Sequence, residues 1–177
     1  MIHESEYWKI PLLRAATWLE KLRITEGSAE CSLVRVEKEL FFGFYAVRKL
    51  LDTFKVSDKT KTMIFELKWF SCVGRVDYFN AHRIDELFNL NKINKETRDV
   101  QFLCNQFIHS YIFVPVEGEQ SQLLGFYICS DRTRHEKLYF IEIQQVLSIF
   151  RTVGRDYPTS AIMKRDSSTG QWEGKIE

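Results

Sequence analysis

The stretch LCNQFIHSY, residues 103–111, contains the two side chains whose types and spacing could do chemistry, Asn105 and His109. On a helix, residues four apart lie on one face about one turn from each other, so the amide and the imidazole could act together as catalytic residues. The same side chains border an apolar stripe and could instead hydrogen-bond to each other or to the backbone, as buried polar groups must. We expect this second, structural arrangement.

The pair and its setting resemble a HEPN domain, a helical fold found in many prokaryotic toxins and defence proteins. The ribonuclease motif of that family has an arginine, often followed by asparagine, and a histidine four to six residues after the arginine. In CNQFIH, Cys104–His109, the asparagine and histidine match, but Cys104 stands in the place of the arginine. The nearest upstream arginine, Arg98, lies eleven residues before His109. The resemblance covers only the helical half of the chain and implies a degenerate relative without the fixed cation that would stabilise phosphate charge.

A second candidate site is the stretch DRTRHEK, residues 131–137, which gathers positive charge between two predicted strands. Guanidinium groups suit bidentate contacts with phosphate or carboxylate. Asp131 and Glu136 partly cancel this charge, and a charged hairpin tip is also commonly just solvated. The candidate binding residues are Arg98, Arg132, Arg134, His135 and Lys137.

Composition restricts the functions that the chain can have. Lys and Arg total 25 against 24 Asp and Glu, a formal net charge of +1, so the overall charge gives no case for binding nucleic acid or anionic membrane. No stretch is long and apolar enough for a membrane span, and the N-terminus lacks the pattern of a secretory signal, so we expect a cytoplasmic protein. The four cysteines are isolated among apolar residues and are predicted to be buried thiols. No motif for a metal or cofactor is present, and we predict neither.

Hydrophobic periodicity predicts the helices that would position these residues. One helix follows Pro11, with the proline in its first turn, and after a break at Gly27 and Ser28 a second runs over residues 29–54. Two aromatics widen the apolar face of this second helix, whose heptad-like spacing suits either the first helix or a partner helix from another chain. We expect packing against the first helix. Gly43 would let another element approach closely. A short helix is expected within residues 76–90, and further helices over 95–109 and 143–154, the last with Gly154 as C-cap.

Alternating or β-branched runs predict strands at 63–70, 111–116, 123–130 and 137–143. Pro115 cannot donate a hydrogen bond to a neighbouring strand, so its strand is expected at a sheet edge or at a bulge. Residues 91–97 are predicted to form a break. We therefore expect an α+β domain over residues 1–156, with an N-terminal helical pair, a small antiparallel sheet and a late helix, followed by a polar tail, 157–177, that is mostly loop and is tethered by Trp172.

These features predict a non-enzymatic macromolecular interaction module, whose partner is another protein or a second copy of the chain. The alternative is a HEPN-like, metal-independent ribonuclease or RNA-binding protein that uses the face of Asn105 and His109. In that alternative His109 would accept a proton from the RNA 2′-hydroxyl.

Overall fold

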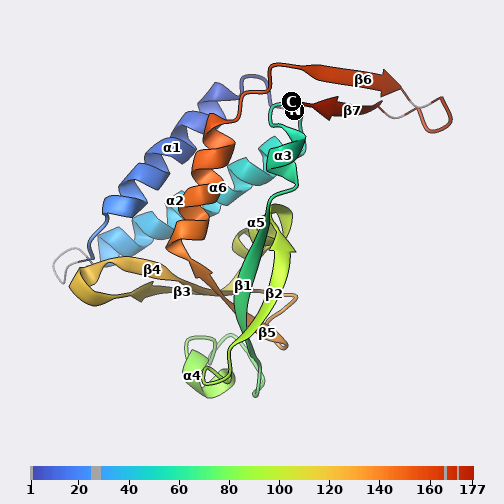
Figure 1. Ribbon diagram of the computed structural model, residues 1–177. Coiled ribbons are helices and arrows are strands. Elements are labelled where there is room, and N and C mark those ends of the chain that lie inside the picture. Colours follow the sequence, from blue (N-terminus) through green and yellow to red (C-terminus); the bar gives the residue numbers. More distant parts are fainter. Residues whose placement is uncertain (1, 25–28, 166, 171) are drawn as a thin grey trace.

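The computed structural model describes the chain except residues 1, 25–28, 166 and 171, and it shows the predicted α+β fold (Figure 1). The expected break at Gly27 and Ser28 lies outside the described residues. The helices are α1 (Glu6–Lys21), α2 (Ala29–Leu51), α3 (Asp58–Lys61), α4 (Ile84–Leu87), α5 (Val100–Ile108), the short 3-10 helix η2 (Glu119–Ser121) and α6 (Ile143–Arg155). The strands are β1 (Ile64–Ser71), β2 (Asn94–Asp99), β3 (Ser110–Glu117), β4 (Leu123–Ser130), β5 (Lys137–Glu142), β6 (Ala161–Arg165) and β7 (Trp172–Ile176).

The main sheet has five antiparallel strands in the order β2-β1-β5-β4-β3. All four strands expected from the sequence are present in it. Pro115 lies on β3 at one edge of the sheet, and the register of β3 against β4 shifts near both ends of the strand. Both the edge position and the irregular pairing fit a residue that has no N–H to donate.

The pleat of the sheet divides the buried residues between two clusters. On one face, Leu67, Ile128 and Tyr139 pack with the helices in the larger core. On the other face, Phe70 and Leu138 pack with the β1–β2 connection that carries α4. The other buried residues of this second cluster are Val76, Leu87, Phe88, Ile112 and Cys129. The sheet thus has one face covered by helices and a second face covered in part by a loop (Figure 1).

Two glycines mark close approaches between helices. A Cβ on Gly43 of α2 would collide with the ring of Phe150 on α6, which confirms the expected close approach. Gly154 was predicted to end α6, but the helix continues through it to Arg155, and the glycine instead admits Leu13 of α1. Pro11 also differs from expectation, because α1 begins at Glu6 and the proline lies inside the helix.

The prediction for residues 94–99 was wrong. Residues 94–99 form strand β2, which pairs with β1 from Ile64↔Asp99 to Trp69↔Asn94, instead of a break followed by a helix from Lys95. Helix α5 begins only at Val100, because the side chain of Asp99 accepts a hydrogen bond from the backbone N–H of Phe102 and caps the helix. The polar residues of β2 alternate in exposure because successive side chains of a strand point to opposite faces of the sheet.

The segment after Asp156 was predicted to be mostly loop, and this prediction was wrong. The segment contains the antiparallel hairpin β6–β7, which projects from the body (Figure 1). Trp172 is exposed and does not tether it. Ile176 does so instead: its side chain is buried, and its backbone N–H donates to the carboxylate of Asp58 at 3.0 Å.

Candidate functional site

Helix α5 positions Asn105 and His109, and the structure places both side chains at the surface. The apolar side of the helix is buried through Val100, Leu103 and Phe107. The hydrogen bond between positions 105 and 109 is a backbone bond, 3.1 Å from the N–H of His109 to the carbonyl of Asn105, as expected where His109 caps the helix. The expectation that the pair is buried and satisfies itself inside the fold was therefore wrong.

The buried polar side chain of α5 is Gln106. Its Oε1 accepts hydrogen bonds from the backbone N–H of Ser130, at 2.9 Å, and from the hydroxyl of Thr133, at 3.2 Å. The backbone N–H of Asp131 also donates to the carbonyl of His109 at 3.1 Å. These bonds hold the β4–β5 turn against the C-terminal end of α5, so the two candidate sites from the sequence meet at one corner of the molecule.

The cations of the β4–β5 turn differ in how far their charges are already paired. Arg134 forms an ion pair with Asp131 at 2.6 Å, lies over the ring of Tyr111 at 4.2 Å, and donates to Nε2 of His135 at 3.1 Å. Arg132 is exposed, and within the described part of the chain it has no ion-pair partner. Of the two arginines in the turn, Arg132 is therefore the one whose charge is not paired within the described part of the chain.

Arg98 and Lys137 lie at a different place, where both bind Glu96 of β2. Arg98 Nε is 2.8 Å and Lys137 Nζ 2.5 Å from the carboxylate, and the hydroxyl of Tyr139 donates to it at 2.7 Å. Burial by itself would raise the pKa of Glu96, but the three donors outweigh burial and hold the pKa at about 2. We call Glu96, Arg98, Lys137 and Tyr139 the Glu96 cluster; its charges are paired within the fold.

Lys137 also lies over the ring of Trp69 on β1, 4.3 Å from the ring centroid. The indole N–H of Trp69 is buried and has no hydrogen-bond partner among the described residues. Burial raises the pKa of Tyr139, and so does its bond to Glu96. Tyr139 therefore remains a neutral donor at physiological pH, which fits a structural role for the cluster.

Arg98 does not supply the missing cation beside His109. Its guanidinium lies over Phe102 in the first turn of α5, whereas His109, seven residues later, caps the last turn, roughly 10 Å farther along the axis. Arg98 and Asn105 do line one shallow pocket of about 390 Å³, but His109 is not among its lining residues. Among the described residues, Arg98, Asn105 and His109 are therefore not brought together at one site.

All four cysteines were predicted to be buried, but only two of them are. Cys104 and Cys129 are buried, and burial raises the pKa of each thiol to about 12. Cys72 is partly exposed and Cys31 is exposed, because Cys31 lies on the outer side of α2. Among the described residues, no group of three or more histidine, cysteine or carboxylate side chains is placed to hold a metal ion, and no helix is long and apolar enough to span a membrane.

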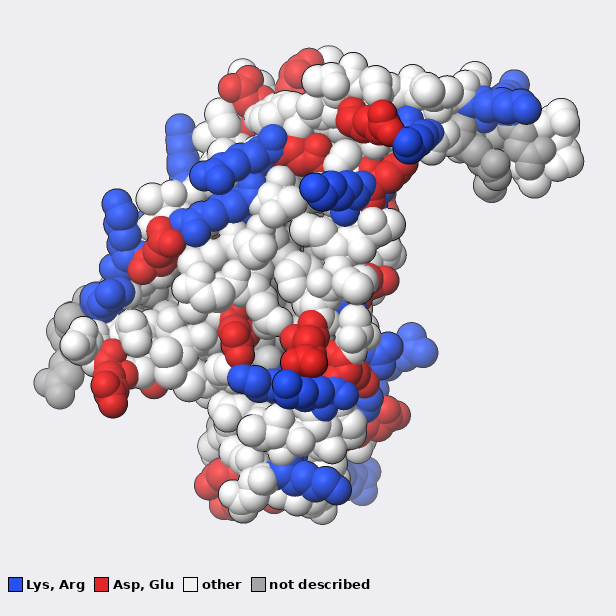
Figure 2. Space-filling view, in the orientation of Figure 1, with Lys and Arg blue, Asp and Glu red and all other residues white. Residues whose placement is uncertain are grey.

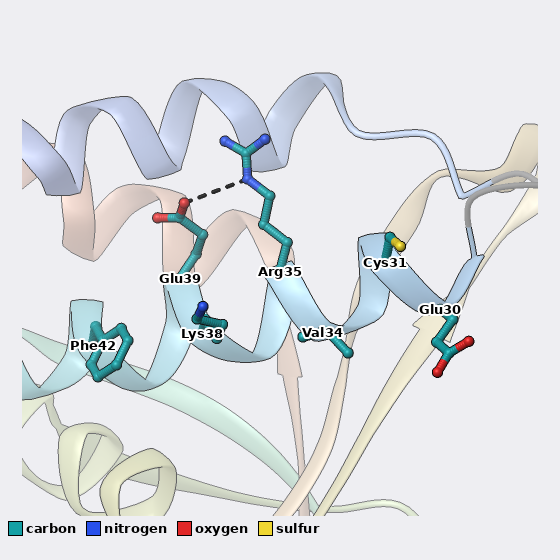
Figure 3. Close-up of a pocket in the computed structure, with 7 residues that line it drawn as sticks. All are labelled: Glu30, Cys31, Val34, Arg35, Lys38, Glu39 and Phe42. Carbon is teal, nitrogen blue, oxygen red and sulfur yellow. Dashed lines mark ion pairs between the residues drawn. The ribbon is translucent and has the colours of Figure 1, made fainter.

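Helix α2 carries a further candidate surface that the sequence did not single out. Its inner side is buried through Val36, Leu40 and Phe44. Its opposite side is also partly apolar: Phe42 is 69% exposed, Val34 49%. We call the side lined by Glu30, Cys31, Val34, Lys38, Phe42 and Tyr45 the outer face of α2; Figure 3 shows most of these side chains along the helix.

Two hollows flank the N-terminal half of α2. One, of about 760 Å³, is lined by residues of α2 itself, including Arg35 and Glu39, which form an ion pair at 3.6 Å (Figure 3). The other, of about 650 Å³, lies between α2 and the edge strand β3, where Phe41 meets Phe113 edge to face. Glu30 and Val34 line both hollows, so this part of α2 is a ridge between two grooves.

Surface charge points to no other single site. Acidic and basic side chains are interspersed over the face of the molecule shown in Figure 2. On the sheet, Lys68 pairs with Glu142 and Lys95 with Glu66, each at 2.7 Å. Neighbouring charges of opposite sign therefore cancel much of the field that would attract a polyanion.

Comparison of the chain with protein-family models, with curated proteins and with solved structures finds no match.

Proposed function

We propose that this protein is an interaction module that binds another polypeptide chain through the outer face of α2. The observation that carries the proposal is the exposure of Val34, Phe42 and Tyr45 on a helix whose opposite side already fills the core. A helix that is apolar on both sides is ordinarily covered on both sides. The outer face of α2 therefore fits an interface better than a solvated surface.

The composition of the outer face suits a protein partner. Aromatic side chains dominate the binding energy of protein interfaces, and Phe42 and Tyr45 lie one turn apart on it. Lys38 lies between Val34 and Phe42, so charge alternates with apolar surface along the helix. This mixture of apolar and charged groups is typical of interfaces that form and dissociate.

Photo-crosslinking from position 42 tests the proposal. We would replace Phe42 by the photoreactive amino acid benzoylphenylalanine in the cells that make the protein, and place the same group at Phe54 as a matched control. Phe54 is a phenylalanine of similar exposure, 58%, that lies outside α2. We expect an adduct with a polypeptide from position 42 and none from position 54. Equal yields at the two positions, or no adduct at all, would contradict the proposal.

The ribonuclease alternative remains a prediction because His109 is exposed and lies beside the turn that carries Arg132. It is tested by incubating the purified protein with single-stranded RNA in the presence of a metal chelator. Cleavage that is lost in a normally folded His109→Ala variant would favour the alternative over the interaction module.

A further inference from the structure

We infer that the chain that covers the outer face of α2 is a second copy of this protein, with the two α2 helices antiparallel and crossing at Val34. This inference rests on the proposed function and names its partner. It draws on the shape of the surface, on its charges, and on the residue at the crossing point.

The shape of the surface is complementary to itself. The N-terminal half of α2 is a ridge between the 760 Å³ and 650 Å³ hollows, and Glu30 and Val34 line both. A two-fold rotation lays the ridge of one copy into a groove of the other, so one surface supplies both partners. Glu30, Val34, Lys38 and Phe42 are spaced four apart and form one row, and rows of this kind interdigitate when helices cross at about −50°.

The charges of the row are complementary under the same rotation. Glu30 lies four residues before Val34 and Lys38 four residues after it. In an antiparallel pair centred on Val34, each Glu30 therefore faces the Lys38 of the other copy, which gives two equivalent ion pairs. Within the described part of the chain, neither side chain has an ion-pair partner, whereas the neighbouring Arg35 is paired with Glu39 and lies 4.0 Å over the ring of Trp18.

This charge pattern favours a second copy over an unrelated helix. A partner of one sign would satisfy either Glu30 or Lys38 and repel the other, whereas an antiparallel copy satisfies both. Valine at the crossing point is small enough for the helices to approach closely, and Phe42, two positions farther along the row, adds exposed apolar surface. Cys31 and its counterpart would lie on opposite sides of the axis, roughly 9 Å apart along the helices, and would not form a disulfide.

Charge reversal tests the inference through the oligomeric state. The dissociation constant of the dimer would be measured by sedimentation velocity over a dilution series for Glu30→Lys, Lys38→Glu and the double variant. Each single variant breaks two ion pairs and creates two like-charged contacts, so we expect it to weaken the dimer about tenfold. The double variant restores complementarity and should return to within about threefold of the original protein.

Lys92→Glu is the matched control, because it makes the same charge change on an exposed residue that lies outside α2, in the connection between β1 and β2. It should leave the dissociation constant unchanged. Circular dichroism would establish that every variant keeps its helical content. A protein that stays monomeric at every concentration, or a double variant no stronger than the single ones, would overturn the inference.

A cysteine at the axis gives an independent test. Val34→Cys in a Cys31→Ser background should form a disulfide-linked dimer under mild oxidation, because a residue on a two-fold axis meets its own counterpart. Leu33→Cys in the same background, one residue off the axis, should not. In the crosslinking experiment, an adduct with a second copy supports both proposals, whereas an adduct only with a different protein supports the proposed function and overturns this inference.

Discussion

The two sides of helix α2 are both apolar but have different surroundings. On the inner side, Phe44 stacks on Phe107 of α5 with ring centroids 3.9 Å apart, and Phe150 of α6 lies against Gly43. On the outer side, Phe42 and Tyr45 are exposed to solvent. The comparison teaches that an apolar helical pattern shows which residues favour burial but not which of them the same chain will cover.

The largest effect should come from truncating one phenylalanine on each side of α2. Phe44→Ala removes a fully buried ring and should lower the free energy of unfolding by about 3–5 kcal/mol. Phe42→Ala removes an exposed ring and should change that free energy by about 0.5 kcal/mol or less in the monomer. Urea unfolding at low protein concentration measures both. Similar losses for the two variants would show that the two sides do not differ as described.

A second test compares charges paired within the fold with charges left at the surface. The pKa of Glu96 is held at about 2 in the folded state, below its ordinary value of 4.5. A carboxyl whose pKa is depressed by folding stabilises the protein above its ordinary pKa, and this stabilisation is lost as the pH falls through the folded value. Between about pH 5 and pH 2 the original protein should therefore lose on the order of 2 kcal/mol through this group, after allowance for solvent screening.

Glu96→Gln cannot ionise, so its unfolding free energy should fall less steeply over the same pH range. Glu117→Gln, at an exposed position of β3 that has no ion pair within the described part of the chain, serves as the matched control and should keep the slope of the original protein. Urea unfolding at several pH values provides the measurement. Parallel pH profiles for Glu96→Gln and the original protein would contradict the structural role assigned to the Glu96 cluster.

Helix α5 also carries one buried and one exposed position that can be compared, but here both residues are polar. Gln106 is buried and accepts two hydrogen bonds that hold the β4–β5 turn in place. Gln106→Ala leaves the backbone N–H of Ser130 without this acceptor and should lower the free energy of unfolding by about 1–2 kcal/mol. Amide hydrogen exchange should also become faster in the turn. Unchanged exchange at Ser130 and Asp131 would show that the turn is held by other contacts.

Much of the fold could be predicted because its elements have local patterns. The strands β1, β3, β4 and β5 follow alternation or β-branched runs, and α2 and α6 follow helical periodicity. The failures lie where a local pattern competes with a longer-range contact. Residues 95–99 extend the helical spacing of α5, but the hydrogen-bonding edge of β1 captures them as strand β2.

The candidate sites were harder to predict because burial depends on distant segments. Gln106 and Asn105 are adjacent polar residues: the β4–β5 turn covers Gln106, whereas Asn105 lies on the side of α5 away from the buried Val100, Leu103 and Phe107 and is exposed. Arg98 and Lys137 are 39 positions apart, and the register of the sheet brings both to Glu96. The neighbours Phe41 and Phe42 did give a signal, because adjacent residues on a helix point about 100° apart and Phe42 lies farther than Phe41 from the direction of the buried Leu40 and Phe44.

The smallest effect on stability is expected at His109, because its side chain is exposed whereas that of Gln106, on the same helix, is buried. The imidazole is exposed at the end of α5, and the interactions that position 109 makes with Asn105 and Asp131 are backbone bonds that alanine keeps. His109→Ala should therefore change the free energy of unfolding by about 0.5 kcal/mol or less, well below the loss for Gln106→Ala. Thermal melting of the two variants side by side measures the difference. If His109→Ala were as destabilising as Gln106→Ala, the imidazole would have to be buried in solution, and the polar pair would belong to the core as its sequence pattern suggests.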